Sequence, residues 1–384
     1  MVDAAVRSTQ VVLLAGAGHA HVEVLRSFTM KPARDATFVL ATRTRFTPYS
    51  GMLPGVVAGL YRFDEAHIDA QRLAAVAGAR IVEQAIVGLD LAASQARCAD
   101  GSTIGYDILS IDIGITPVTS DVPGASDNVI PVKPIDGFLA RFDELLQRVR
   151  AGDVRRIAIV GGGAGGVELA LAVEHRLRRV AASAGRDPAA LELHLVTGVS
   201  RILPDLPKGV ACRLERHLAA RGVDVRCSAR VTAVAADHLQ LDGHPSVPVD
   251  AVLWVTEAAA PDWLRGTGLP LNPWGFIAVE AGLDVRGHSR VFAAGDVAQF
   301  GPRDLPKAGV YAVRQGPVLA GNIRRCLAGD PPVPYRPQRE ALVLMSTGER
   351  HAVGTRNGLV VEGDWVWRVK DWLDRRWVRR YQSL

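Results

Sequence analysis

Hydrophobic residues in this chain form short runs that alternate with longer stretches of mixed polarity. The run 157–160 is typical of a buried strand, and it leads through a group of glycines into residues 164–176, where apolar positions recur with helical spacing. The same order of apolar run, glycine turn and helix occurs near the N-terminus, over residues 10–26. Strands that alternate with helices predict an α/β fold built around parallel sheet.

The segments that follow these two units also match each other. Residues 78–81 correspond to 222–225, and the strand in 106–114 corresponds to the strand in 249–257. Matching positions are separated by 142 to 145 residues throughout. Repetition at a nearly fixed separation indicates that one supersecondary unit occurs twice.

The glycines of the second unit fit the pattern G-x-G-x-x-G. Gly161 permits the tight turn, Gly163 lets a pyrophosphate approach the backbone, and Gly166 lets helix and strand pack closely. The free N–H groups at the start of the helix then face the phosphates. The second unit is therefore predicted to be a Rossmann-like dinucleotide-binding domain.

The first unit keeps two of the three glycines. Gly16 and Gly18 match the first two positions, His21 replaces the third, and His19 and Ala20 complete the turn. Two histidines at this spacing without further ligands do not make a metal site, so no metal is expected. We expect a second dinucleotide at this turn.

An Asp or Glu at the end of the second strand usually binds the adenosine ribose of a dinucleotide. In the first unit that strand ends at Thr42 and Arg43, and in the second it ends at Thr197. Arg201 lies nearby, which is compatible with the 2′-phosphate of NADP. The sequence therefore leaves NADH and NADPH open, with NADH preferred.

Two loops of the first unit contain further candidate residues. Pro48 lies in the Pro/Gly-rich stretch 47–55, which could pass against a flat aromatic ring system or could be an ordinary surface loop. Asp112 lies within the buried strand 108–113, where its carboxylate needs hydrogen-bond partners. We favour backbone N–H groups at the Gly114 turn as these partners over a place beside the cofactor.

The second half of the chain contains more candidates. Strand 289–294 closes on Gly295 and Asp296, whose carboxylate could accept a hydrogen bond from a ribityl hydroxyl or could merely cap the next helix. A helix over 307–322 could point its N-terminal amides at an electron-rich ring edge. Its first residues, Lys307, Ala308 and Gly309, are therefore cofactor-binding candidates. Lys133 could reach a phosphate or could be solvated.

Composition narrows the class of protein. The chain has 384 residues, 48% of them hydrophobic, and 38 glycines, which suits two or three α/β domains. A net charge of +5 is modest, so it favours anionic cofactors or a membrane surface only weakly and does not indicate nucleic acid. The four cysteines are scattered, which favours a reducing compartment over a disulfide framework. Without a signal peptide layout or an apolar run near ~20 residues, we expect a cytoplasmic protein, peripheral on a membrane at most.

Several motifs together resemble the pyridine nucleotide-disulfide oxidoreductase superfamily, and within it the NADH dehydrogenase-like FAD proteins found alone or joined to selenide, water dikinase. They are Gly16-Ala-Gly-His-Ala-His21, Tyr49-Ser-Gly-Met-Leu-Pro-Gly55, Ser110-Ile-Asp-Ile-Gly114, the fingerprint 161–168, Ala294-Gly-Asp296, 307–317 and 370–376. The resemblance implies an FAD-dependent oxidoreductase with FAD in the first unit and NAD(P)H in an inserted second unit. It implies the division 1–122 (FAD), 123–249 (NAD(P)H), 250–328 (FAD) and a C-terminal segment 329–384 for contact with a partner or a membrane.

Departures from the family pattern affect the expected chemistry. Ser50, Gly51 and Met52 stand where disulfide reductases have redox cysteines, so dithiol chemistry is not expected. Val310 and Arg314 replace the two quinone-contacting glutamines of type II NADH dehydrogenases. The acceptor stays open between a quinone and a selenium or sulfur species. The alternative function is a flavin-binding redox sensor with little turnover. Glu257, in place of an expected glycine, could alter how the domains meet.

Two further features lie outside the nucleotide turns. Glu168, on the first turn of the second unit's helix, could fix the nicotinamide near the flavin or could simply be solvated. The tail 364–381 is basic and rich in tryptophan. On a helix its residues Trp365, Val369, Trp372 and Leu373 form one apolar stripe. We expect this stripe to pack over the flavin domain or at a dimer seam, with membrane contact as the alternative and RNA binding least favoured.

Overall fold

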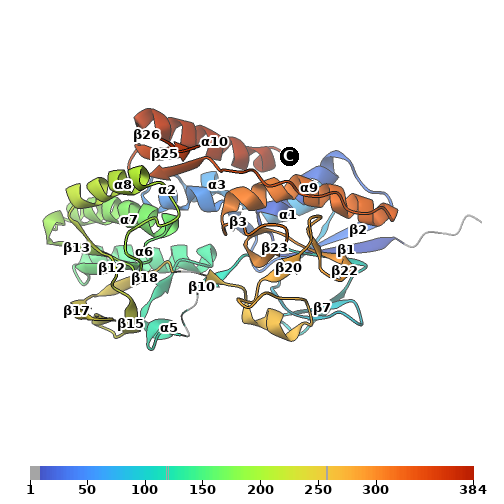
Figure 1. Ribbon diagram of the computed structural model, residues 1–384, viewed down its shortest axis with the longest axis horizontal. Helices are drawn as coiled ribbons and strands as arrows, with labels where there is room; N and C mark the ends of the chain where they lie inside the picture. The colour runs from blue at the N-terminus through green and yellow to red at the C-terminus, as the bar shows by residue number, and fades with distance from the viewer. Residues whose placement is uncertain (1–8, 118, 120, 257) are drawn as a thin grey trace, which may run out of the picture.

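The computed structural model describes residues 9–117, 119, 121–256 and 258–384, and it contains two α/β units bridged by a C-terminal segment (Figure 1). The first unit has an eight-stranded sheet in the order β23-β20-β21-β22-β9-β1-β2-β5. These strands are β1 (Gln10–Ala15), β2 (Ala36–Ala41), β5 (Arg80–Val82), β9 (Ile108–Ile111), β20 (Ile277–Val279), β21 (Asp284–Val285), β22 (His288–Ala293) and β23 (Ala298–Phe300). Helices α1 (His19–Met30) and α9 (Gly309–Ala328) pack against each other on this sheet.

The second unit has a five-stranded parallel sheet in the order β11-β18-β12-β13-β14. Its strands are β11 (Ile130–Pro131), β12 (Arg156–Val160), β13 (Glu192–Val196), β14 (Val223–Arg226) and β18 (Ala251–Trp254). Its main helices are α6 (Ile135–Ala151), α7 (Ala164–Ser183) and α8 (Lys208–Ala220). The short elements α5 (Ala125–Asn128) and η2 (Pro188–Ala190) complete it.

The internal repeat predicted from the sequence is confirmed by the strand order. Strands β9-β1-β2-β5 of the first sheet and β18-β12-β13-β14 of the second have the same arrangement. Each set is accompanied by a three-stranded antiparallel sheet. These are β6 (Ile86–Asp90), β7 (Gln95–Cys98) and β8 (Thr103–Gly105) in the first unit and β15 (Val231–Val234), β16 (His238–Leu241) and β17 (His244–Pro248) in the second.

The two units are joined by two crossing strands. β10 (Thr116–Pro117) pairs antiparallel with β19 (Ala258–Ala259), so the chain leaves the first unit and returns to it at the same place. Because β18 belongs to the second sheet, the return follows residue 254, slightly later than the predicted boundary at 249. Glu257 lies outside the described residues.

The connection between β2 and β5 contains short elements that reach toward the second unit. They are β3 (Phe46–Pro48), η1 (Ser50–Met52), α2 (Leu53–Val57), α3 (Phe63–Ala66), β4 (His67–Asp69) and α4 (Ala70–Val76). Between β19 and α9 lie η3 (Asp262–Gly266) and η4 (Gly295–Val297). Leu53 and Val57 on α2 are buried in the core of the second unit, so the loop ties the two units together.

The C-terminal segment lies across both units at the top of Figure 1. It comprises β24 (Val343–Ser346), β25 (Ala352–Arg356), β26 (Leu359–Gly363) and α10 (Asp364–Gln382). The strands contact α7 and α8 of the second unit, and α10 contacts α3 and β4 of the first. Among the helices of the described residues, none is long and apolar enough to cross a membrane.

The apolar stripe on α10 does not pack over the flavin domain as predicted, whereas its place at a dimer seam stays a prediction. Trp365 and Trp372 are each 56% exposed, Val369 is 40% exposed and Leu373 is 36% exposed. The opposite face is buried instead, and it consists of Val366, Lys370, Asp374, Trp377, Val378 and Tyr381. This face packs against the protein because its polar groups form hydrogen bonds and ion pairs there. For example, the Tyr381 hydroxyl donates to Glu23 across 2.8 Å.

Candidate functional site

The glycine turn of the second unit leaves room for a phosphate. A Cβ on Gly166 would lie 1.9 Å from the carbonyl oxygen of Gly161, so this glycine permits the close packing of α7 on β12. A Cβ on Gly163 would meet nothing within 4 Å. Gly163 also caps α7 without a side chain, so the first N–H groups of the helix face this open space. The turn therefore fits a pyrophosphate.

The corresponding turn of the first unit contains a carboxylate. A Cβ on Gly18 would lie 2.2 Å from the Cγ of Asp112. Asp112 Oδ2 accepts hydrogen bonds from the backbone N–H groups of Ala20 (2.8 Å) and His21 (3.2 Å). Its partners are thus the first turn of α1 and not the Gly114 turn that we favoured. Asp112 is held by backbone amides and lies at the nucleotide turn at the same time.

His21 replaces the third glycine without opening the turn. Its Nδ1 lies 2.6 Å from the carbonyl oxygen of Gly16, and its Nε2 lies 2.8 Å from the hydroxyl of Ser110. Burial lowers the pKa of His21 to about 4, so the imidazole is neutral. The ring therefore links α1 to the turn after β1 and to β9, where a glycine would have allowed direct contact between helix and strand.

The turn after β22 faces the same end of α1. A Cβ on Gly295 would lie 2.5 Å from Asp112 Oδ1, and the Gly295 N–H donates to Gln315 on α9 across 2.7 Å. Asp296 pairs with Lys133 across 3.1 Å, so Lys133 is not simply solvated. Gly18, Asp112, Gly295 and Asp296 therefore belong to one site.

The predicted residues at the start of α9 border this site. Lys307 donates to the carbonyl oxygen of Ala298 (2.6 Å), and its ammonium lies 4.0 Å from the centre of the Phe276 ring. Burial lowers the pKa of Lys307 to about 8. Ala308 caps the helix, and Gly309 begins it close to the Ser50 hydroxyl. Lys307 thus stabilises the loop that presents the helix N-terminus.

His19 is enclosed by aromatic rings. Its ring centre lies 5.2 Å from that of Trp377 and 5.4 Å from that of Tyr49, and Trp377 and Tyr49 are themselves stacked at 4.3 Å. Burial lowers the pKa of His19 to about 4. Pro48 ends β3 directly before Tyr49. The sequence did not point to Trp377, because aromatic residues are common throughout the tail.

Arg43 and Arg201 are occupied by contacts within the protein. Arg43 forms an ion pair with Asp136 on α6 (3.0 Å). The Arg201 guanidinium donates to the backbone carbonyls of Leu203, Pro204 and Leu206 at 2.6 to 3.0 Å. Arg201 therefore stabilises its own loop and is not free for a 2′-phosphate. Arg230 is exposed beside Gly198 and is the better placed cation at this strand end.

Glu168 lies in a buried polar cluster where both units meet the C-terminal segment. It accepts a hydrogen bond from the Ser346 N–H (2.7 Å), and burial raises its pKa to about 7. Lys370 is 6% exposed and donates to the carbonyl of Gly51 (2.7 Å) and to Asp374 (2.8 Å). Burial opposes the charge on Lys370, but the carboxylates of Asp374 and Glu168 outweigh it, so the pKa of Lys370 is raised. Glu168 is thus half-buried and hydrogen-bonded, and not a free surface carboxylate.

Sequence reasoning identified Glu168 but missed its partners. Lys370 and Asp374 are four residues apart, which on a helix is the spacing of an ordinary surface ion pair. Asp374 also accepts a hydrogen bond from Tyr49. Together Tyr49, Asp374, Lys370 and Glu168 connect the loop after β3 to helix α7 of the second unit.

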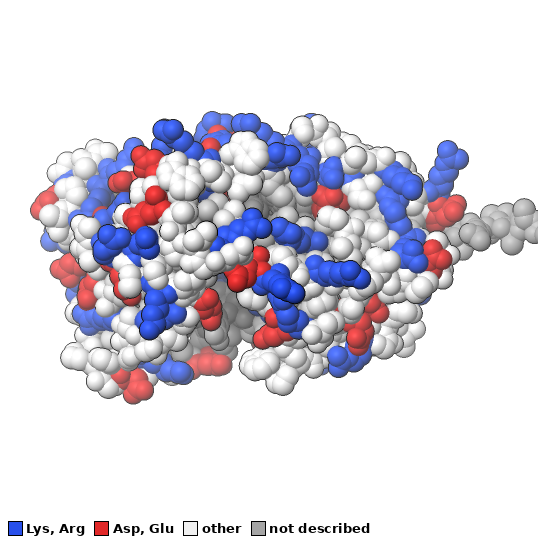
Figure 2. All heavy atoms as spheres, turned by 45° about the horizontal axis from the view of Figure 1, so that its top comes forward, with Lys and Arg blue, Asp and Glu red and all other residues white. Residues whose placement is uncertain are grey.

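A groove of about 830 Å³ separates α9 from α10. Its lining includes Val313, Pro317, Tyr335, Trp372, Leu373 and Trp377 together with four exposed arginines, Arg314, Arg336, Arg376 and Arg380. None of these arginines forms an ion pair with another described residue. Basic side chains gather across the middle of the face shown in Figure 2. The Trp377 indole N–H and the Tyr335 hydroxyl are buried without a partner among the described residues.

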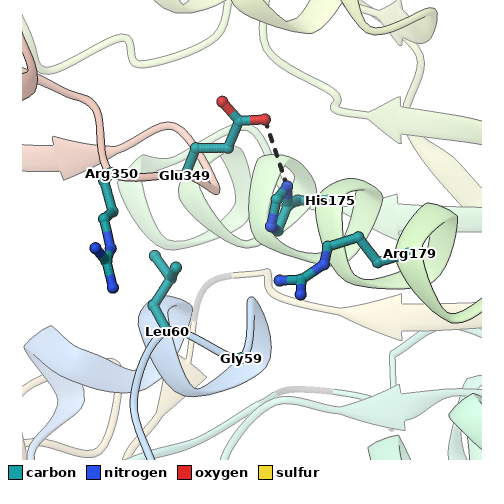
Figure 3. A pocket seen from close by; sticks show the side chains of 6 residues that line it. All are labelled: Gly59, Leu60, His175, Arg179, Glu349 and Arg350. Carbon is teal, nitrogen blue, oxygen red and sulfur yellow. Dashed lines mark ion pairs between the residues drawn. The ribbon is translucent and has the colours of Figure 1, made fainter.

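A smaller cavity of about 440 Å³ lies between α7 and the turn that joins β24 to β25 (Figure 3). His175 and Arg179 approach it from α7, and Glu349 lies 3.5 Å from the His175 ring. Gly59 and Leu60 close it from the first unit. The residues of the two nucleotide turns do not line this cavity, so it is separate from the cofactor site.

A third cluster joins α8 to the C-terminal strands. His217 lies 2.7 Å and His351 lies 3.9 Å from Glu362, a grouping that could hold a cation. Arg213 and Arg216 pair with the other oxygen of the same carboxylate. Because these guanidinium groups already supply positive charge, the cluster acts as an ion-pair network between α8 and β26.

Comparison with known proteins agrees with this geometry. The family pyridine nucleotide-disulphide oxidoreductase matches residues 10–316. A demethylphylloquinone reductase from Synechocystis is 30% identical over 258 residues, which cover 64% of this chain and 61% of the relative's length. A type II NADH:quinone oxidoreductase from Staphylococcus epidermidis is 22% identical over 386 residues, which cover 95% of this chain and 94% of the relative.

Solved structures share the fold. NDH2 from Plasmodium falciparum in complex with NADH has a TM-score of 0.80 at 12% identity, covering 97% of this chain and 99% of that structure. The sulfide:quinone oxidoreductase of Aquifex aeolicus has a TM-score of 0.79 at 16% identity, covering 97% and 92%. The expected α/β fold with two Rossmann-like units is confirmed. The chain belongs to the pyridine nucleotide-disulphide oxidoreductase family and is an oxidoreductase that uses FAD and NAD(P)H.

Proposed function

We propose that the protein oxidises NADH and reduces a quinone through FAD, without a redox-active disulfide. The observation that carries the proposal is the position of Trp377, which forms a wall of the α9–α10 groove while it stacks on Tyr49 and His19 at the FAD turn. A ring seated in this groove would be separated from the flavin site by little more than one aromatic layer. The quinone named in several relatives supports the same acceptor.

The two glycine turns divide the binding of the cofactors. The Gly163 turn and the N-terminus of α7 would bind the pyrophosphate of the nicotinamide nucleotide, and the turns at Gly18 and Asp296 would bind FAD. When bound, FAD accepts a hydride from the nicotinamide and passes the electrons to the acceptor. The loop 48–57 contacts both units, since Tyr49 lies beside His19 at the first turn and Leu53 and Val57 are buried in the core of the second unit.

Glu168 supplies a proton near neutral pH in this proposal. Conversion of a quinone to a quinol consumes two protons, and a side chain with a pKa close to 7 can hold and release one efficiently. Glu168, Lys370, Asp374 and Tyr49 are connected by hydrogen bonds or close charge contacts that reach from α7 to the Trp377 wall. Placement of the nicotinamide by Glu168, which the sequence suggested, stays a second role for the same carboxylate.

The cysteines support chemistry without a dithiol. Cys98 is buried, and Cys212, Cys227 and Cys326 are partly or fully exposed, and all four are unpaired. None belongs to η1 or α2, the segments that pass beside the flavin turn. Electrons would therefore travel from the flavin to the acceptor directly.

The surface around the groove suits a lipid interface. Trp372 and Leu373 project outward beside Arg376 and Arg380, and tryptophan with arginine favours the headgroup region of a membrane. A quinone that is dissolved in the membrane could then enter the groove from the same side. We propose peripheral attachment through α10; a homodimer seam on this face is the competing arrangement.

A substitution that narrows the groove tests the proposal. Pro317 lines the groove and is exposed, so Pro317→Trp should fill space without disturbing the core. We expect NADH oxidation with a short-chain quinone to fall at least tenfold, while reduction of ferricyanide, which needs no groove, changes less than twofold. Val76→Trp, at a 44% exposed site on α4 of the first unit, is the control and should affect neither.

Four outcomes would contradict the proposal. An equal loss of turnover with quinone and with ferricyanide would show that Pro317→Trp acts at the flavin site. Unchanged turnover with quinone would show that quinone does not pass through the groove. If NADH bleaches the flavin but quinone, ferricyanide and oxygen all fail to restore its colour, the protein is a redox sensor. Turnover with a selenium or sulfur species and not with quinone would identify that class as the acceptor.

A further inference from the structure

Asp112 stands where the second unit has empty space. The repeat aligns Gly18 with Gly163 and Asp112 with Val255, positions that are 145 and 143 residues apart. In the second unit a Cβ on Gly163 would meet nothing within 4 Å, whereas in the first a Cβ on Gly18 would collide with the Asp112 carboxyl at 2.2 Å. The space through which a pyrophosphate approaches a second glycine thus contains a carboxylate in the FAD unit.

The Asp112 carboxyl has little room to move away from this position. It is 3% exposed, and it lies between the backbone of Gly18 on one side and that of Gly295 on the other. Its Oδ2 is fixed by the N–H groups of Ala20 and His21. These amides belong to the helix terminus that would attract the diphosphate, so Asp112 and the cofactor compete for the same positive potential.

The charges around Asp112 do not neutralise the diphosphate, which would be a second anion beside the Asp112 carboxylate. Asp296 on η4 adds negative charge, and its partner Lys133 neutralises only that carboxylate. Lys307 lies beyond Asp296 and donates to the carbonyl of Ala298. His19 and His21 on α1 are neutral, because burial lowers the pKa of each to about 4. From α9 the site receives only the uncharged Gln315.

We propose that FAD binding is coupled to protonation of Asp112, so that the neutral carboxyl accommodates the diphosphate and the ionised carboxylate expels it. Asp112 is then the residue that sets the pH range in which the protein retains its flavin. Burial raises the pKa of Asp112 to about 7 in the protein without cofactor, and an adjacent diphosphate raises it further. The diphosphate diester itself keeps its charge between pH 6 and 8.5.

The direction of the effect follows from proton linkage. Because the complex with FAD holds a proton that the free protein loses as pH rises through about 7, the affinity for FAD must fall with increasing pH. Uptake of one proton corresponds to a limiting slope of about tenfold in the dissociation constant per pH unit. Below that pKa both forms are protonated, and the affinity is independent of pH.

The test is the retention of flavin by the holoenzyme at different pH values. Purified holoenzyme is diluted in buffers from pH 5.5 to 8.5, and the free FAD at equilibrium is measured by its fluorescence. We expect the wild-type dissociation constant to be flat below pH 6.5 and to rise about tenfold or more by pH 8.5. Asp112→Asn preserves shape without charge, and its dissociation constant should stay at the low-pH value throughout.

Two controls keep the proposal falsifiable. His19→Gln should leave the pH profile unchanged, because the pKa of His19 lies below the range tested. If Asp112→Asn does not fold, Asp112→Ala, which is smaller and also uncharged, must show the same flat profile. A wild-type profile that is flat, or that persists in the uncharged variant, would overturn the proposal. Because the readout is bound flavin and not turnover, it is independent of the quinone proposal.

Discussion

The Glu168 carboxylate accepts a hydrogen bond from the backbone N–H of Ser346 across 2.7 Å, which joins the first turn of α7 to the end of β24. Burial raises the pKa of Glu168, and the nearby charge of Lys370 partly offsets that rise. Lys370 also donates a hydrogen bond to the Gly51 carbonyl. Three parts of the chain that are far apart in sequence therefore meet through polar contacts in a buried place. This junction connects the architecture to the proposed electron transfer.

Breaking the ion pair between Lys370 and Asp374 should cause a measurable loss of stability. Lys370→Met leaves the 7% exposed Asp374 without its cation, and breaking a buried pair in this way costs about 3–5 kcal/mol. Replacing both partners, Lys370→Met with Asp374→Leu, should recover most of that loss. The free energy of unfolding in urea gives both values. Equal losses for the single and double variants would show that the pair does not act as a unit.

Alanine substitutions at two glycines of the second unit should have different effects, one on folding and the other on NADH binding. Gly166→Ala places a Cβ 1.9 Å from the Gly161 carbonyl, so the unit should fold poorly or not at all. Gly163→Ala meets open space and has an ordinary backbone conformation, so the protein should fold normally. Its affinity for NADH should nevertheless fall at least tenfold, because the methyl group occupies the path of the pyrophosphate. Circular dichroism and NADH titration separate the two effects.

An unchanged affinity of Gly163→Ala for NADH, with flavin reduction at the wild-type rate, would place the pyrophosphate elsewhere. Gly137→Ala, on α6, is the matched control. A Cβ there also meets nothing within 4 Å, and Gly137 lies outside both glycine turns, so the change should alter neither folding nor binding.

The sequence predicted the repeated α/β units well, because their signals are local. Apolar runs, glycine turns and helical spacing determine each strand and helix within about 30 residues, and the repeat supplied independent support. The neutral bridging role of His21 and the capping role of Asp112 could not be predicted. Both depend on contacts between residues about 90 positions apart in the chain.

The error on α10 has a similar cause. Its apolar stripe has the spacing expected of a packed face, but the face that packs contains Lys370 and Asp374. A hydrophobic pattern cannot reveal that the half-buried Glu168 and the Gly51 carbonyl, which lie on other segments, would interact with a lysine of α10. The contacts of Arg201 could not be predicted for the same reason, since the carbonyls that accept its hydrogen bonds are brought to it by the turn after β13.

The pKa of Glu168 predicts how turnover depends on pH. Burial raises this pKa above its ordinary value, so the carboxyl is protonated below pH 7 and ionised above it. Turnover with quinone should therefore decline as pH rises through about 7, and Glu168→Gln should lower it roughly 100-fold with a flat profile. The rate of flavin reduction by NADH separates this role from placement of the nicotinamide, because loss of a proton donor alone leaves that rate unchanged. If the pH profile of turnover with quinone is the same in Glu168→Gln as in the wild type, Glu168 does not deliver the proton.

The same shift affects stability. Because the folded-state pKa exceeds the ordinary value, the contribution of Glu168 to stability is present at low pH and is lost as pH rises to about 7. Melting temperatures of the wild type and Glu168→Gln should thus diverge in favour of the variant at alkaline pH.

The exposed stripe on α10 and the four arginines that line the groove predict binding to anionic lipid. Vesicles that contain phosphatidylglycerol should sediment the wild-type protein at low salt and release it at high salt. Replacing Arg314, Arg336, Arg376 and Arg380 by Gln should abolish sedimentation, whereas the same change at the exposed Arg34, Arg80, Arg141 and Arg150 should not. If both quadruple variants sediment like the wild type, the groove is not a lipid surface, and a concentration-dependent dimer would favour the competing seam.

Anaerobic double mixing tests the transfer from NADH to quinone most directly. In the first mix, one equivalent of NADH should bleach the flavin absorbance near 450 nm. In the second mix, a short-chain quinone should restore the absorbance within the time of one turnover, and Pro317→Trp should slow only this second step. A flavin that NADH reduces but quinone leaves reduced would contradict the account.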